Sequence, residues 1–145
     1  MIKGALLLAT KAGVLVATLA VTAFAQTLPG EALASPNYAG AIFAEACMKT
    51  RPRYRNADRV LEANGLVKIP TGTFYHTEFD MSVKPQAGVG CSVVFRLGAN
   101  FDPKTLTEAF AGAVEERASV SPGDVTIDIS RISADRAYLA ARTTP

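Results

Sequence analysis

The clearest pattern in the chain is an alternation of apolar and polar positions over residues 89–97. The apolar positions recur at every second residue: Val89, Cys91, Val93, Phe95 and Leu97. The positions between them are smaller or more polar: Gly90, Ser92, Val94 and Arg96. A period of two predicts a half-buried β-strand that turns one face toward a core.

Alternation also predicts the other strands, the longest of them at residues 73–83. Its apolar face is expected to hold Tyr75, Phe79, Met81 and Val83. Its polar face is expected to hold Phe74, His76, Glu78, Asp80 and Ser82. A turn at residues 85–88 would join this strand to the next as a hairpin. Further strands are expected at residues 66–69, 125–130 and 137–142, the last with the weakest pattern.

Apolar residues three and four positions apart predict helices around these strands. The first begins at Ser35-Pro36, a favoured cap followed by proline in the first turn, and ends before Pro52. Its apolar stripe comprises Ala39, Ile42, Phe43, Ala46 and Cys47. A shorter helix is expected from Asn56 or Ala57 to Asn64, and a third begins at Asp102-Pro103. The stripe of the third comprises Leu106, Ala109, Phe110, Ala113 and Val114.

The expected order of elements is α-α-β-β-β-α-β-β. Short strands with one apolar face suit a mainly antiparallel sheet that carries helices on one face. We therefore predict an α+β fold, a two-layer sandwich. A parallel doubly wound sheet is not expected, because helices and strands do not alternate regularly.

The N-terminal segment has the features of a secretory signal peptide. Lys3 and Lys11 precede an uncharged apolar run at residues 12–24, which is too short for a membrane helix, and residues 23–25 form an A-x-A cleavage site. The prediction is a signal peptide at residues 1–25, a flexible lead-in at 26–34 and a single domain at 35–145. The alternatives are an uncleaved anchor or a second cleavage site after residue 34.

The charge of the chain changes once this segment is removed. The whole sequence of 145 residues has a net charge of +2, and loss of Lys3 and Lys11 leaves 13 basic against 13 acidic residues. A neutral domain has no overall field to recruit nucleic acid or anionic lipid. No nucleic-acid partner is expected, and membrane contact is expected only through an uncleaved signal peptide.

The chain has two cysteines, Cys47 and Cys91. Exported proteins with an even number of cysteines usually form disulfides. Cys47 lies on the stripe of a predicted helix and Cys91 on the core face of a predicted strand, so a bond between them would fasten helix to sheet. A catalytic thiol pair is less expected, because redox cysteines usually lie close in sequence.

Two other groups of side chains are candidates for chemistry. His76, Glu78 and Asp80 alternate along one strand face and could hold a metal or form an acid–base set. Against this, such positions lie about 6–7 Å apart, which is wide for one ion, and a solvated strand face has the same pattern. No cofactor is expected.

The second group is a basic stretch at residues 49–59. Its members are Lys49, Arg51, Arg53, Tyr54, Arg55 and Arg59, with Asp58 as the one acid. Arginines around a tyrosine could bind phosphate or carboxylate groups through bidentate contacts and stacking. The alternative is a solvated loop whose charges suit the C-terminus of the preceding helix.

These observations give three hypotheses of function. The first is a small exported domain, expected to be periplasmic, that is not an enzyme and binds an envelope component or a protein partner. The second is a small hydrolase or metal-dependent enzyme that uses His76, Glu78 and Asp80. The third is a structural assembly subunit that contributes an exposed strand edge.

Overall fold

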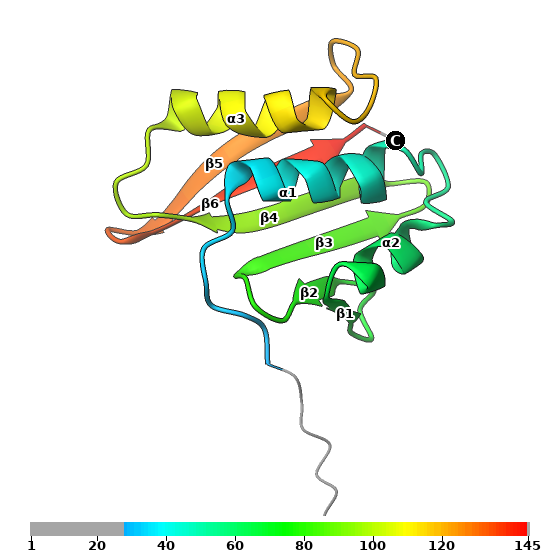
Figure 1. Cartoon of the computed structure of the whole chain (residues 1–145), viewed down its shortest axis with the longest axis horizontal. Coiled ribbons are helices and arrows are strands. Elements are labelled where there is room, and N and C mark those ends of the chain that lie inside the picture. Colours follow the sequence, from blue (N-terminus) through cyan, green and yellow to red (C-terminus); the bar gives the residue numbers. More distant parts are fainter. Residues whose placement is uncertain (1–27, 145) are drawn as a thin grey trace, which may run out of the picture.

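The computed structural model describes residues 28–144, which form helices packed on one face of an antiparallel sheet (Figure 1). The helices are α1 (Pro36–Phe43), continued by a π-helical turn η1 (Ala44–Met48), then α2 (Ala57–Ala63) and α3 (Pro103–Glu115). The strands are β1 (Leu66–Lys68), β2 (Phe74–His76), β3 (Met81–Gln86), β4 (Gly90–Leu97), β5 (Val125–Ser133) and β6 (Arg136–Thr143). The sheet order is β1-β2-β3-β4-β6-β5, so β1 and β5 are the edge strands. The predicted α+β sandwich is confirmed.

The expected single strand at residues 73–83 is wrong, because the structure has two strands there. A turn at residues 77–80 separates β2 from β3, so the order contains one more strand than expected. Phe74 lies opposite Val83, and both are buried. The turn shifts the side-chain alternation by one position, which places Phe74 and His76 on the core face and Tyr75 on the other face.

The helix termini and stripes agree with the sequence pattern. The Ser35 hydroxyl accepts a hydrogen bond from the Tyr38 N–H at 3.1 Å, and the Asp102 carboxylate accepts one from Thr105 at 3.1 Å. The stripe residues of the first helix are all buried: Ala39, Ile42, Phe43, Ala46 and Cys47. The alternation in β4 is also confirmed, except that Val89 is exposed in the turn before the strand.

The core is centred where α1 and α3 cross over β4 and β6. Phe110 of α3 lies between Phe43 and Phe95, with ring centroids 5.6 and 5.9 Å away. Gly40 lets the two helices come this close, because a Cβ there would lie 2.7 Å from the Phe110 carbonyl oxygen. The helix pair and the central strands thus form one continuous apolar layer.

The predicted disulfide between Cys47 and Cys91 is confirmed. It joins η1 to β4, with the two Cα atoms 5.4 Å apart and both residues fully buried. A structural disulfide of this kind indicates an oxidising location outside the cytoplasm. Within residues 28–144, no helix has the length and apolar character required to cross a membrane.

The segment before α1 is fixed to the sheet. Gly30 N–H donates to the His76 carbonyl at 2.9 Å, and Ala32 N–H donates to the Glu78 carbonyl at 3.0 Å. Ala32 also pairs with Phe79 as an isolated bridge. The part of the expected flexible lead-in that the structure describes therefore makes specific backbone contacts, whereas the predicted signal peptide lies outside the described residues.

Candidate functional site

His76, the single histidine of the chain, is only 4% exposed and lies on the helix side of the sheet. Its Nδ1 accepts hydrogen bonds from the backbone N–H groups of Glu78 and Phe79, at 3.0 and 3.1 Å. A nitrogen that accepts two N–H groups carries no proton, so the proton is assigned to Nε2, which lies 3.0 Å from the Tyr38 hydroxyl. Burial lowers the pKa of His76 below 6.5, and the charge of Glu78 opposes that shift. The imidazole is a structural group that holds the turn after β2.

The H-x-E-x-D pattern does not bring its three side chains together, which corrects the expectation from the sequence. Glu78 is exposed in the turn. The Asp80 carboxylate lies 3.1 Å from Arg96 Nε and accepts a hydrogen bond from the Tyr138 hydroxyl at 3.1 Å. Within residues 28–144 no three His, Cys, Asp or Glu side chains are grouped so that they could hold a metal ion. In the described chain these three side chains therefore do not form a shared metal site.

Most of the basic stretch forms the loop between η1 and α2, and Arg59 lies in α2 itself; two of the cations are already paired. Lys49 Nζ lies 2.7 Å from Glu45 Oε1. Arg51 lies 3.5 Å from the Asp124 carboxylate, and its Nε donates to a carbonyl at the end of η1. The pairing with Asp124 ties this loop to the turn that precedes β5.

Tyr54 anchors the same loop from within. The residue is buried, and its hydroxyl lies 2.8 Å from Thr143 Oγ1, which also accepts the Cys91 N–H at 2.9 Å. The loop is therefore fastened to β6 and β4 beside the disulfide. A buried ring does not reach a surface ligand, so the expected stacking role of Tyr54 is wrong.

Lys49 is exposed although it is paired, and Arg59 is exposed on α2; the exposed arginines of the loop itself are Arg53 and Arg55. Neither forms an ion pair within the described residues. They border an open hollow of about 330 Å³ at the loop surface. An anion at this loop would meet Arg53 and Arg55 first, and the backbone that carries them is already ordered.

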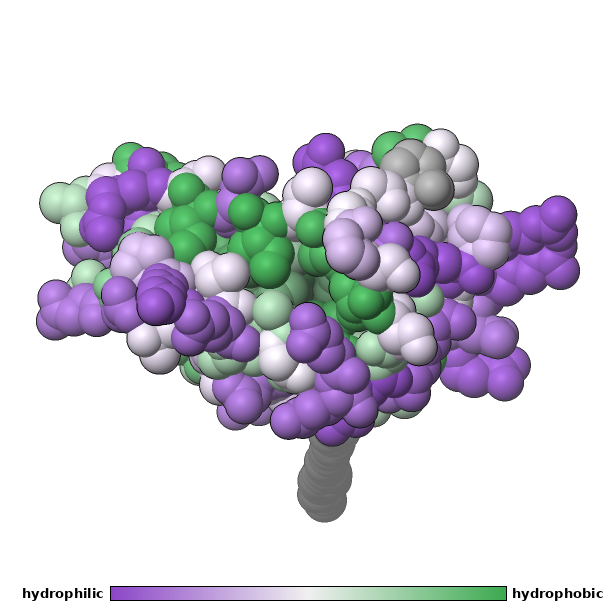
Figure 2. All heavy atoms as spheres, turned by 90° about the horizontal axis from the view of Figure 1, so that it is seen from above, coloured by the Kyte–Doolittle hydropathy of each residue, from purple (hydrophilic) through white to green (hydrophobic). Residues whose placement is uncertain are grey.

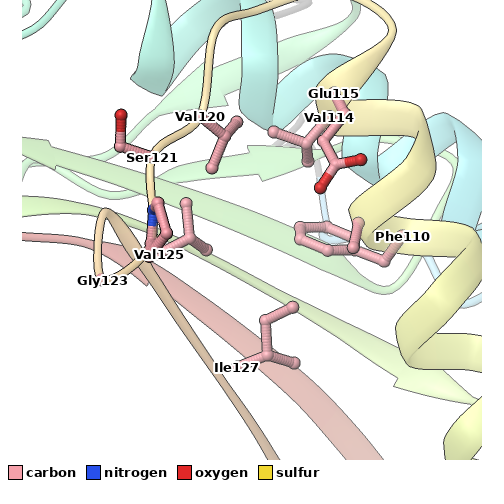
Figure 3. A pocket seen from close by; sticks show the side chains of 10 residues that line it. Phe110, Val114, Glu115, Val120, Ser121, Gly123, Val125 and Ile127 are labelled. Carbon is pink, nitrogen blue, oxygen red and sulfur yellow. The ribbon is translucent and has the colours of Figure 1, made fainter.

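A second surface, which the sequence did not reveal, is an apolar groove of about 310 Å³ between α3 and β5. Phe110 and Val114 point into it from α3, and Val125 and Ile127 point into it from β5 (Figure 3). Seen from above, apolar side chains gather in a depression with polar side chains around it (Figure 2). Glu115 is the one ionisable residue of the lining. Phe110 and Val114 are buried, so the accessible apolar part of this groove beside the edge strand is formed by the half-buried Val120, Val125 and Ile127.

The edge of β5 beside this groove has no strand paired to it in the described chain. Thr144 N–H donates to the Asp124 carbonyl at 3.0 Å, so these two residues form a hydrogen-bonded pair. In an antiparallel ladder hydrogen-bonded and non-hydrogen-bonded pairs alternate. Every second residue of β5 after Asp124 therefore bonds to β6. The residues between them point their N–H and C=O groups out of the sheet; they are Val125, Ile127 and Ile129.

The two edges of the sheet differ in how they are protected. β1 has 3 residues, one of which is Lys68, and a short charged edge discourages pairing with another chain. β5 has 9 residues and contains no proline or lysine. Its first half combines free backbone groups with apolar side chains, so it is the edge suited to accept another strand.

No protein-family model, no curated protein and no solved structure matches this chain. The groove, the β5 edge and the basic loop are therefore the features from which a function is inferred.

Proposed function

We propose that this is a small exported domain, periplasmic or secreted after signal-peptide cleavage, that is not an enzyme and binds a protein partner through β5. The observation that carries the proposal is the free edge of β5 with an apolar groove beside it. Strand addition uses such an edge: main-chain hydrogen bonds supply affinity, and pockets for alternate side chains supply specificity. β5 is paired with β6 from Val125 to Ser133, so the edge is formed before a partner arrives and binding needs little ordering of this domain.

The proposal predicts that blocking one backbone donor of the edge abolishes partner capture. Ile127→Pro removes the N–H at the centre of the free edge but removes no hydrogen bond between β5 and β6. The matched control is Ile127→Val, which shortens the side chain as proline does but keeps the backbone N–H. The mature domain and both variants, each checked for folding by circular dichroism, are used to capture partners from an envelope extract.

Capture of the same protein by the wild type and Ile127→Val, with at least a tenfold loss for Ile127→Pro, is the expected result. Equal capture by all three would show that the partner does not add a strand to β5. A folded protein that captures no partner by this edge would also contradict the proposal.

A second candidate function is anion binding at the basic loop. It is favoured by Arg53 and Arg55, which are exposed on an ordered loop and unpaired within residues 28–144. The double variant Arg53→Gln/Arg55→Gln should weaken a salt-sensitive contact with an anionic group, because exposed charges are screened over about 8 Å at physiological ionic strength. Arg136→Gln, an exposed arginine at the start of β6 and outside the basic stretch, is the control. Unchanged capture by the double variant would mean that the loop is a solvated surface segment and not an anion-binding site.

A further inference from the structure

We infer that the strand added to β5 is β5 of a second copy of this chain, so that two sheets join into one across a two-fold axis. This inference rests on the proposed function, because it names the occupant of the same edge. The free groups of the edge belong to three residues spaced evenly about Ile127. A set centred on one residue is self-complementary: an antiparallel copy, turned about an axis through Ile127, presents the same donors and acceptors in reverse order.

The side chains fit this register. On the helix face, Ile127 lies opposite its own copy, and Val125 lies opposite Ile129 of the second copy. On the other face, Thr126 lies opposite Asp128 of the second copy, so a hydroxyl can donate to a carboxylate. No like charges are opposed in this pairing, and apolar side chains meet apolar side chains.

The neighbouring registers are worse. A two-fold axis through Asp128 would place the two carboxylates directly opposite each other, which is destabilising. An axis through Ile129 would place Ile127 opposite Arg131, where the strand also leaves its regular register between Arg131 and Ser133. The register centred on Ile127 is therefore the one that both the charges and the backbone favour.

A strand added to β5 would also lie beside the groove between α3 and β5. Side chains on the helix face of an added strand would lie beside Ile127 and near Val125, the half-buried apolar residues that β5 contributes to the groove. The second copy supplies valine and isoleucine at those positions. Each copy thus covers the groove of the other while its own edge becomes paired, which removes two exposed edges at once.

The test is the mass of the mature, disulfide-bonded protein by sedimentation over a wide range of concentrations. We expect a reversible change from one copy to two, and we expect Ile127→Pro to remain a single copy while Ile127→Val associates. A single copy at every concentration would overturn this inference but not the proposed function, which partner capture by the same variants decides separately. Two copies that form equally well in Ile127→Pro would overturn the use of this edge for self-association.

The register has its own test at an exposed position. In the dimer, residue 126 of each copy faces Asp128 of the other copy, so each substitution creates two new cross-strand pairs. Thr126→Asp places a carboxylate opposite a carboxylate in both pairs, whereas Thr126→Lys places an ammonium opposite a carboxylate in both. Cross-strand pairs contribute roughly 0.2–1 kcal/mol each, so the dissociation constant should rise by roughly two- to thirty-fold for aspartate and fall by a similar factor for lysine. Equal constants for the two variants would overturn the register centred on Ile127.

Discussion

Replacing Cys47 and Cys91 together by alanine should lower the free energy of unfolding by about 2–5 kcal/mol. The bond closes a loop whose ends are 44 residues apart, and it joins η1 to the central strand β4. Cross-linking a loop of this length lowers the conformational entropy of the unfolded chain. In a chain-entropy treatment this stabilises the folded state by about 4 kcal/mol. Both side chains are fully buried, so their truncation also removes packing contacts. For a domain of ordinary stability, this is a large part of the total.

The measurement is denaturant unfolding followed by circular dichroism, because the chain has no tryptophan to report by fluorescence. The single variants serve as controls: each breaks the bond, so Cys47→Ala and Cys91→Ala should fall close to the double variant. A double variant within 1 kcal/mol of the wild type would mean that the link contributes little to the fold.

The second large effect expected is a loss of stability as the pH falls below about 6.5, caused by His76. In the folded protein Nδ1 accepts two backbone N–H groups, and burial lowers the pKa of His76 from 6.5. The unfolded chain therefore binds a proton at a higher pH than the folded chain does. The stabilisation is complete above the unfolded pKa and decreases as the pH falls toward the folded pKa, by at most about 1.4 kcal/mol per pH unit for one proton.

Two measurements check this expectation. The imidazole signals of the single histidine, followed by nuclear magnetic resonance, should titrate below pH 6.5. His76→Gln should be less stable than the wild type at pH 7 but should lose most of the dependence on pH between 6.5 and 5. A folded-state pKa at or above 6.5 would contradict the assignment of Nδ1 as an acceptor of two N–H groups.

The acid effect also has a predicted location. The Nδ1 acceptor holds the turn between β2 and β3, and the same turn carries the backbone contacts of Gly30 and Ala32. Protonation of Nδ1 would turn this acceptor into a donor, and its hydrogen would repel the N–H groups of Glu78 and Phe79 that now donate to it. The amides of this turn and of the segment before α1 should therefore exchange faster at low pH than those of β4.

Much of the fold follows from local patterns in the sequence. Ser35-Pro36 and Asp102-Pro103 mark helix starts because cap and proline act within one turn. The alternation around Cys91 gives the core face of β4 because side chains in a strand point to alternate sides. The disulfide partner followed from count alone, since two cysteines allow one pairing.

The rest depends on contacts between segments that are distant along the chain. Four residues of turn between β2 and β3 reverse the faces of Phe74 and His76, and that turn is held by hydrogen bonds to the segment before α1. Among arginines Tyr54 looks like an exposed residue in the sequence, but in the structure it is buried and its hydroxyl meets Thr143, which is 89 residues away along the chain. The place of β5 at the sheet edge follows from strand order, which alternation does not encode.

The most direct test of β5 as the binding edge is hydrogen exchange of its individual amides, measured in dilute protein and again in the associated state. In dilute protein the amides of Thr126, Asp128 and Ser130 should be protected by β6, whereas those of Val125, Ile127 and Ile129 should exchange rapidly. Association, with a second copy or with a captured partner, should slow exchange at Val125, Ile127 and Ile129. Association that leaves these three amides in rapid exchange would contradict strand addition at β5.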